Sequence, residues 1–210
     1  MDALNPFVFD MAQAKTLTEK ELKRILAFIA IKRHAARNRA MLLMTHLAGM
    51  RVGEVAALLV KDVLSDDGRV RPEVRLLPEQ TKGSRARTVF LNERLQKELA
   101  AYLATLKRVQ PDMPLFYTQK RLAFSANTLC QHFHFLYKEA GIDGASSHSG
   151  RRTFITNLAS KGVGVRVLMA LAGHQNIATT QRYIDVNDDM QLRCTVNSRH
   201  VRFKQPAPVS

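Results

Sequence analysis

The chain has 210 residues, of which 46% are hydrophobic, and its formal net charge is +14 at pH 7. That is enough apolar residues for one core, while no apolar run is long enough to span a membrane and no signal-peptide pattern opens the chain. Two cysteines, Cys130 and Cys194, exclude a disulfide framework or a four-cysteine zinc site, so we expect a cytoplasmic protein. The excess of Lys and Arg favours a polyanionic partner, nucleic acid before an anionic membrane surface.

The N-terminal part of the sequence predicts helices. Residues 1–15 are apolar without a clear period and are interpreted as an arm. Thr18 and Glu21 form the pattern of a capping box, and the apolar residues after them lie on one helical face. A buried helix is predicted over 41–48, because that segment is apolar on every side. A further helix is predicted through 54–60.

A small sheet follows, and then helices again. Strands are predicted around 70–77 and 88–91, with Lys82, Gly83 and Ser84 as the turn between them. Apolar periodicity predicts helices after Asn92, around 129–140, over 151–160 and over 165–171. The fold class is therefore mainly α with a small antiparallel β-sheet (α+β). We expect one domain over 16–189, a basic tail over 190–210 and no separate N-terminal domain.

The common cofactor and metal signatures are absent from the sequence. There is no phosphate-binding loop, no Rossmann glycine pattern and no His-Glu-x-x-His motif. His132 and His134 are two residues apart on a helix, so their side chains diverge and make a poor metal pair. The sequence thus predicts no metal and no cofactor.

Several cationic residues occupy sequence positions that allow either a structural or a functional interpretation. Arg51 and Glu54 are spaced as an ordinary helix-surface ion pair, and Lys82 in a polar turn is ordinarily just solvated. His148 and Arg151 are three residues apart, so on a helix they would share a face suited to a phosphate oxygen. The alternative for this pair is a polar helix start.

The segment from Leu171 to Tyr183 is unusual for the core. Gly173 allows a tight turn from which His174 can project beyond a helix end. Tyr183 is surrounded in sequence by threonine, glutamine and arginine, whereas a core tyrosine usually has apolar neighbours. Both residues are therefore candidates for chemistry.

Four sequence blocks occur in order along the chain: G-M-R-V-G-E-V-A-A-L, T-K-G-S-R-A-R-T-V-F-L, H-S-G-R-R-T-F and L-A-G-H-Q-N-I-A-T-T-Q-R-Y. Together they resemble the catalytic domain of the tyrosine recombinase (phage integrase) family over about residues 15–187. The chain resembles the short single-domain members, including fimbrial-type DNA invertases. One departure is Arg152, where many members have histidine. Another is the lack of the separate core-binding domain that typical members carry before the catalytic domain, so the chain could equally be a fragment.

The resemblance implies a role for each candidate residue. Tyr183 would be the nucleophile that attacks a DNA phosphate, His148 would help remove its proton, and Lys82 would protonate the leaving 5′-oxygen. The remaining three would bind and stabilise the phosphate through charge and hydrogen bonds: Arg51, Arg151 and His174. No cofactor is implied, because a phosphodiester is exchanged for a phosphotyrosine of similar energy.

The function implied by the resemblance is site-specific DNA recombination through a 3′-phosphotyrosine intermediate. The implied partners are double-stranded DNA and further copies of the chain, which would form a homo-tetramer on paired DNA sites. Accessory DNA-bending proteins are a further implied partner. Two alternatives stay open from the sequence: a type IB-like topoisomerase that works as a monomer, and a catalytically silent DNA-binding remnant of an integrase.

Overall fold

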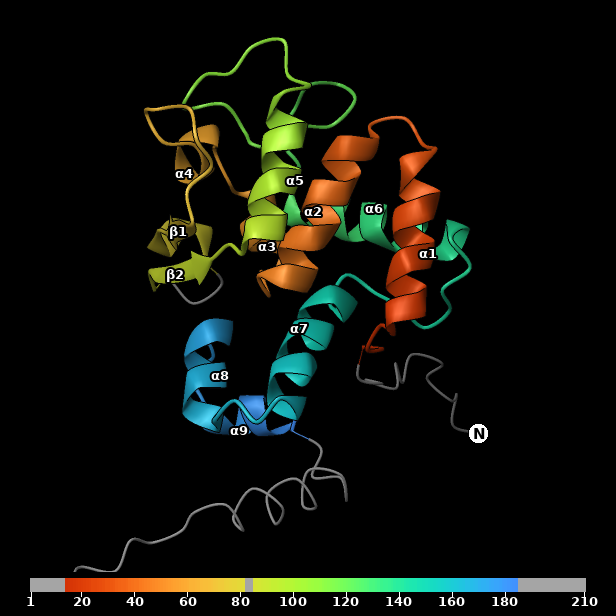
Figure 1. Ribbon diagram of the computed structural model, residues 1–210, viewed down its shortest axis with the longest axis vertical. Coiled ribbons are helices and arrows are strands. Elements are labelled where there is room, and N and C mark those ends of the chain that lie inside the picture. The colour runs from red at the N-terminus through yellow and green to blue at the C-terminus, as the bar shows by residue number, and fades with distance from the viewer. Residues whose placement is uncertain (1–13, 82–84, 185–210) are drawn as a thin grey trace, which may run out of the picture. The chain divides into compact units, whose positions relative to one another are not determined.

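The computed structural model describes residues 14–81 and 85–184. Contacts divide the chain into two compact units, Met1–Phe154 and Ile155–Ser210. The described part of the first unit is mainly helical with one antiparallel strand pair, so the predicted fold class is confirmed (Figure 1). The predicted turn at Lys82, the predicted tail and residues 1–13 of the predicted arm lie outside the described residues.

The first two helices form much of the core of the first unit. Helix α1, Glu19–Ala30, begins at the predicted capping box of Thr18 and Glu21. Helix α2, Ala35–Leu47, covers the predicted buried segment except for its last residue, Ala48, and begins six residues earlier. The added residues include Arg37 and Asn38, two polar residues that are buried.

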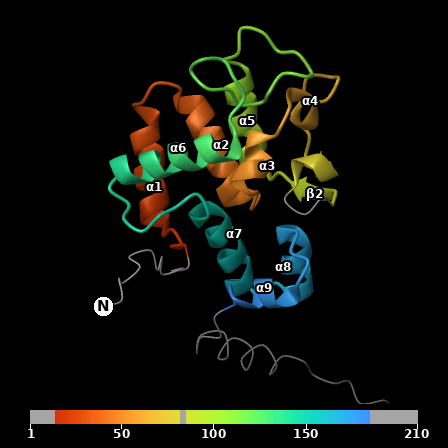
Figure 2. The same cartoon turned by 180° about the vertical axis from the view of Figure 1, so that it is seen from behind.

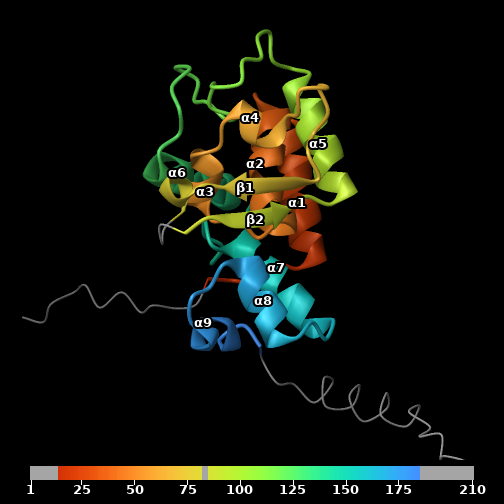
Figure 3. The same cartoon turned by 90° about the vertical axis from the view of Figure 1, so that its left-hand side faces the viewer.

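The region between α2 and the sheet differs from the prediction. The single helix expected through 54–60 is wrong: two short helices occupy the region, α3 at Val52–Ala56 and α4 at Val60–Val63. Strands β1, Glu73–Leu76, and β2, Arg87–Phe90, pair antiparallel with Glu73 opposite Phe90, and the short 3-10 helix η1, Pro78–Gln80, follows β1 (Figure 3). Val74 and Leu76 turn inward from β1, so the sheet is anchored to the core on one face.

Two longer helices complete the core of the first unit. Helix α5, Glu93–Leu103, starts at Asn92 as predicted and packs on α2. Helix α6, Ala126–Glu139, packs on α3 and α1 (Figure 2). The interior lies around α2, where four consecutive residues from Met41 to Met44 are completely buried.

The last three described helices are α7, Ser149–Ser160, α8, Val165–Ala172, and α9, Ile177–Gln181. The boundary between the two units falls inside α7. In the second unit α8 packs against α9, a short helix that the sequence analysis does not predict. In the described part of the chain, no helix has the length and apolar character needed to cross a membrane.

Candidate active site

Arg51 lies immediately before α3 and is held by Glu54, one turn later. The Glu54 carboxylate accepts a 2.7 Å hydrogen bond from the Arg51 backbone N–H and lies 2.9 Å from Arg51 Nη1. The second partner of Glu54 is Arg87 on β2, whose Nη2 lies 2.6 Å from the same carboxylate. The ion pair predicted from the i,i+3 spacing is therefore present, but it is one part of a three-residue cluster that joins α3 to the sheet.

Glu54 is 1% exposed, so its charge state depends on these two arginines. Burial raises the pKa of a carboxylate, but hydrogen bonds and charge from Arg87 and Arg51 outweigh burial and hold the Glu54 pKa below its ordinary value. The carboxylate is thus ionised at neutral pH. It fixes Arg51 in place while the cluster as a whole keeps one positive charge.

Arg151, on the first turn of α7, is tied to the turn that precedes Arg51. Its Nη1 donates a 2.6 Å hydrogen bond to the carbonyl of Gly49, and the residue is 6% exposed. Gly49 has φ +63°, and a Cβ there would lie 2.3 Å from Phe154 Cδ1. Since consecutive Cα atoms are about 3.8 Å apart, Arg151 contacts the backbone within about 8 Å of the Arg51 Cα. The first unit therefore brings these two predicted residues to one turn.

The start of α7 is closely packed against the rest of the first unit. A Cβ on Gly150 would lie 2.2 Å from Thr45 Oγ1, and Thr153 Oγ1 accepts a 2.8 Å hydrogen bond from the Leu17 backbone. His148 directly precedes the helix, and its carbonyl accepts the N–H of Arg152 at 2.9 Å. His148 therefore stands at the start of the helix, and Arg151 lies on its first turn.

The second unit brings together the other two described candidates, His174 and Tyr183. His174 follows Gly173, which ends α8 in the left-handed conformation. Its Nδ1 lies 2.9 Å from the hydroxyl of Thr180, which is completely buried. The Tyr183 ring stacks on the His174 ring, with 5.8 Å between centroids and 21° between planes. Helix α9 thus fixes the imidazole on one side and places the tyrosine beside it.

The candidate residues therefore fall into two groups. Arg51, His148 and Arg151 belong to the first unit, and His174 and Tyr183 belong to the second. Lys82 lies outside the described residues. Arg87 and Thr180 are not predicted from the sequence, because their spacing from Glu54 and His174 does not indicate a contact.

The chain belongs to the phage integrase family. The sequence pattern of the Phage integrase family matches residues 15–190, which include all six candidate residues. The family resemblance inferred from the four blocks is thereby confirmed.

Named relatives and solved structures agree with this assignment. The chain is 30% identical over 189 residues to tyrosine recombinase XerA of Thermococcus kodakarensis, covering 88% of this chain and 63% of that protein. A crystal structure of XerA recombinase superposes with a TM-score of 0.69 and 27% identity, covering 90% of this chain and 66% of that one. The Tn1549 transposon integrase, solved in complex with a circular intermediate DNA, has the same fold, with a TM-score of 0.73, 20% identity and coverage of 90% and 67%. The chain thus spans less than two thirds of the length of the curated XerA relative.

Proposed function

We propose that this chain is a tyrosine-type site-specific DNA recombinase that cleaves and rejoins double-stranded DNA through a 3′-phosphotyrosine intermediate. Membership of the phage integrase family supports the proposal, as does the likeness to proteins named tyrosine recombinases. The observation that carries it is the stacked His174–Tyr183 pair, an aromatic hydroxyl placed beside an imidazole in a polar segment. The excess of 32 Lys and Arg over 18 Asp and Glu suits a DNA substrate.

In the proposed cleavage step, Tyr183 Oη attacks a phosphorus atom of the DNA backbone. A P–O bond to tyrosine forms and the bond to the 5′-oxygen breaks. His148 takes the tyrosine proton and Lys82 donates a proton to the departing 5′-oxygen, so charge and protons balance. Rejoining is the reverse step, in which a 5′-hydroxyl attacks the phosphotyrosine and releases Tyr183.

Arg51, Arg151 and His174 would stabilise the phosphate while it is five-coordinate. A guanidinium offers two parallel N–H donors that match two phosphate oxygens, and its charge is permanent. The positions of Arg51 and Arg151 around the 49–51 turn suit two donors on one phosphate. His174 is already fixed by Thr180, so its ring can donate in a set direction.

Exchange between two duplexes sets the partners we propose. Two sites with two strands each require four cleavages, so a homo-tetramer on paired DNA sites supplies one Tyr183 for each strand. Accessory DNA-bending proteins would assist where a site must be bent to pair.

The test is a denaturing-gel assay for a covalent protein–DNA adduct, using supercoiled plasmid that carries the DNA flanking the gene. We expect wild type to form the adduct and Tyr183→Phe to bind DNA without forming one. Tyr137→Phe is the matched control, because the Tyr137 hydroxyl has no hydrogen-bond partner among the described residues, and it should behave as wild type. We expect EDTA to leave the adduct yield unchanged.

Each other result has a defined meaning. An adduct that persists in Tyr183→Phe excludes this residue as the nucleophile. Binding without any adduct in the wild type favours a silent DNA-binding remnant. Relaxation of a plasmid with no requirement for paired sites favours a topoisomerase.

A further inference from the structure

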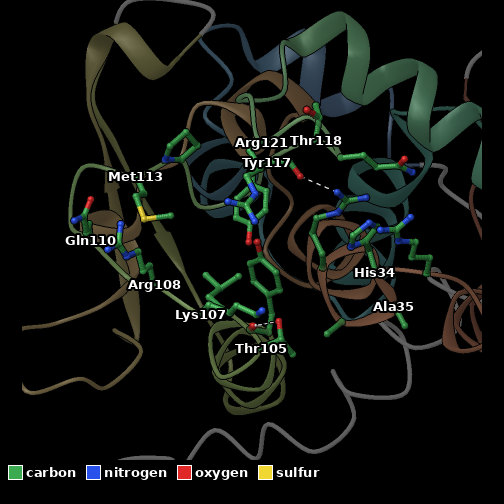
Figure 4. A pocket seen from close by; sticks show the side chains of 17 residues that line it. His34, Ala35, Thr105, Lys107, Arg108, Gln110, Met113, Tyr117, Thr118 and Arg121 are labelled. Atoms are coloured by element: carbon green, nitrogen blue, oxygen red, sulfur yellow. Dashed lines mark hydrogen bonds between the residues drawn. The ribbon is translucent and has the colours of Figure 1, made fainter.

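A cavity of about 1100 Å³ lies in the first unit, away from the candidate catalytic residues (Figure 4). Its walls come from the turn between α1 and α2, the end of α5 and the segment that follows α5. Five of the residues that line it are charged, and all five are cations: Arg33, Arg37, Lys107, Arg108 and Arg121. No Asp or Glu is among the described residues that line it, so the charges in its wall are unbalanced there.

Arg37 distinguishes this cavity from an ordinary solvated basic surface. It is 6% exposed, lies over the Phe124 ring at 5.3 Å, and donates to the Tyr117 carbonyl at 2.7 Å. It also donates to Asn38 Oδ1 from Nε and Nη2. These acceptors are neutral, so within the described chain they satisfy the N–H groups without compensating the charge. Burying such a guanidinium is costly, and an anion in the cavity would reduce that cost.

The beginning of α2 adds donors to the same cavity. Ala35 and Ala36, on the first turn, line it, and this 13-residue helix has no side-chain cap and no acidic residue in its first turn. Backbone N–H groups at a helix start lack partners within the helix and carry partial positive charge, which favours anions.

His34 carries two further signs of an incomplete site. Its Nε2 is buried without a hydrogen-bond partner among the described residues. Burial and the charges of Arg37 and Arg33 lower the His34 pKa, which reports the positive field at this position. His34 and Arg121 are also the two non-glycine residues of the described chain with positive φ, 63° and 60°, and both line the cavity. Strained backbone of this kind is commonly retained at ligand sites.

We propose that this cavity is a second phosphate-binding site, separate from the one formed by Arg51 and Arg151. The two lie at opposite ends of α2, whose 13 residues span about 20 Å. The ligand is a phosphate group, carried either by the DNA backbone or by a free nucleotide, because both present the same charged oxygens. The inference stands on the cavity itself and does not require the recombinase activity.

The test is a residue-resolved NMR titration of the full chain with inorganic phosphate at constant ionic strength. We expect the backbone amides of Ala35, Ala36 and Arg37 to shift and saturate, while an equal amount of chloride has no such effect. Any binding at the 49–51 turn would be seen separately, through its own amides. The proposal is overturned if the three α2 amides do not respond, or if they shift without saturating.

Two double variants show whether the basic wall is responsible. Arg33→Ala with Arg121→Ala removes two exposed cations of the cavity, and we expect phosphate affinity at the α2 amides to fall about tenfold or more. Lys20→Ala with Lys23→Ala removes two exposed cations on α1 outside the cavity and should leave that affinity unchanged. Equal loss in both variants would indicate a general effect of net charge and would overturn the site.

The source of the phosphate is decided with Tyr183→Phe protein, which is expected not to trap DNA covalently. If adding duplex DNA displaces phosphate from the α2 amides, the DNA backbone occupies the cavity. If DNA leaves these amides unchanged while a nucleotide competes with phosphate, the ligand is a free nucleotide. If wild-type protein forms no covalent adduct but still binds phosphate saturably at the α2 amides, the proposed activity is refuted and the proposed phosphate site is retained.

Discussion

At the scale of single residues, Gly49 lies between two candidate arginines, since its carbonyl accepts from Arg151 and Arg51 follows two residues later. It needs a left-handed backbone, and a side chain there would meet the Phe154 ring. We expect Gly49→Ala to lower the free energy of unfolding by about 3 kcal/mol, because conformational strain and overpacking add. Gly68→Ala is the control, since its φ is +79° and nothing lies within 4 Å of the new Cβ. Chemical denaturation should give only about 1 kcal/mol for the control. If the two variants lost the same free energy of unfolding, the contact with Phe154 would not contribute to the effect of Gly49→Ala.

Glu54 provides a second prediction at this scale, in the pH dependence of stability. Its pKa in the folded chain is lowered, so its ionised form stabilises the fold above the ordinary pKa of about 4.5, and this contribution is lost as pH falls. We expect Glu54→Gln to cost about 3 kcal/mol near pH 7, because Arg51 and Arg87 lose a buried counter-charge. Urea unfolding should show the difference from wild type shrinking below about pH 4.5. A difference that stays constant with pH would mean that the charge of Glu54 contributes nothing.

At the scale of elements, helix α9 acts as a support for His174. Thr180 is completely buried and holds the imidazole through its hydroxyl. Thr180→Val keeps the shape but removes the hydroxyl, so the ring loses its fixed orientation. We expect adduct formation to slow about tenfold or more, while the free energy of unfolding falls by only about 1 kcal/mol.

Thr180→Ser is the matched variant for this prediction, because it keeps the hydroxyl and loses a methyl group. Serine should restore adduct formation even if it lowers stability as much as valine does. Rates that follow stability across the two variants would show that Thr180 serves packing alone.

The elements also show what local sequence can predict. The starts of α1 and α5 follow from capping residues, Thr18 and Asn92, which bond within three residues of themselves. The start of α2 does not follow, because its N-cap residue, His34, makes no side-chain capping hydrogen bond and its first turn has no acidic residue. Helix α9 is only five residues long, too short for a periodic signal.

Some contacts of the candidate site also follow from local sequence, and others do not. The pairing of Arg51 with Glu54 follows from their spacing, whereas Arg87 comes from a strand 33 residues beyond Glu54. Thr180 reaches His174 across the turn between α8 and α9, which no helical spacing predicts. Motif order therefore supplies the candidate residues, while the residues that hold them in place depend on tertiary packing.

At the scale of the whole molecule, the candidate residues are divided between two compact units. Arg151 depends on the Gly49 turn, and His174 depends on Thr180. The whole chain has a net charge of +14, which favours binding to DNA.

Binding to DNA should accordingly weaken steeply with salt. Each phosphate contact contributes about −0.9 to the slope of log affinity against log salt, so about five contacts would cost roughly 500-fold between about 50 and 200 mM. Fluorescence anisotropy with Tyr183→Phe protein measures this slope without covalent trapping. If the DNA backbone enters the basic cavity, Arg33→Ala with Arg121→Ala should reduce the slope by about two, and Lys20→Ala with Lys23→Ala should not. A flat salt dependence in the parent protein would contradict phosphate contacts as the main source of affinity. Equal slopes in both double variants would place the DNA outside the cavity.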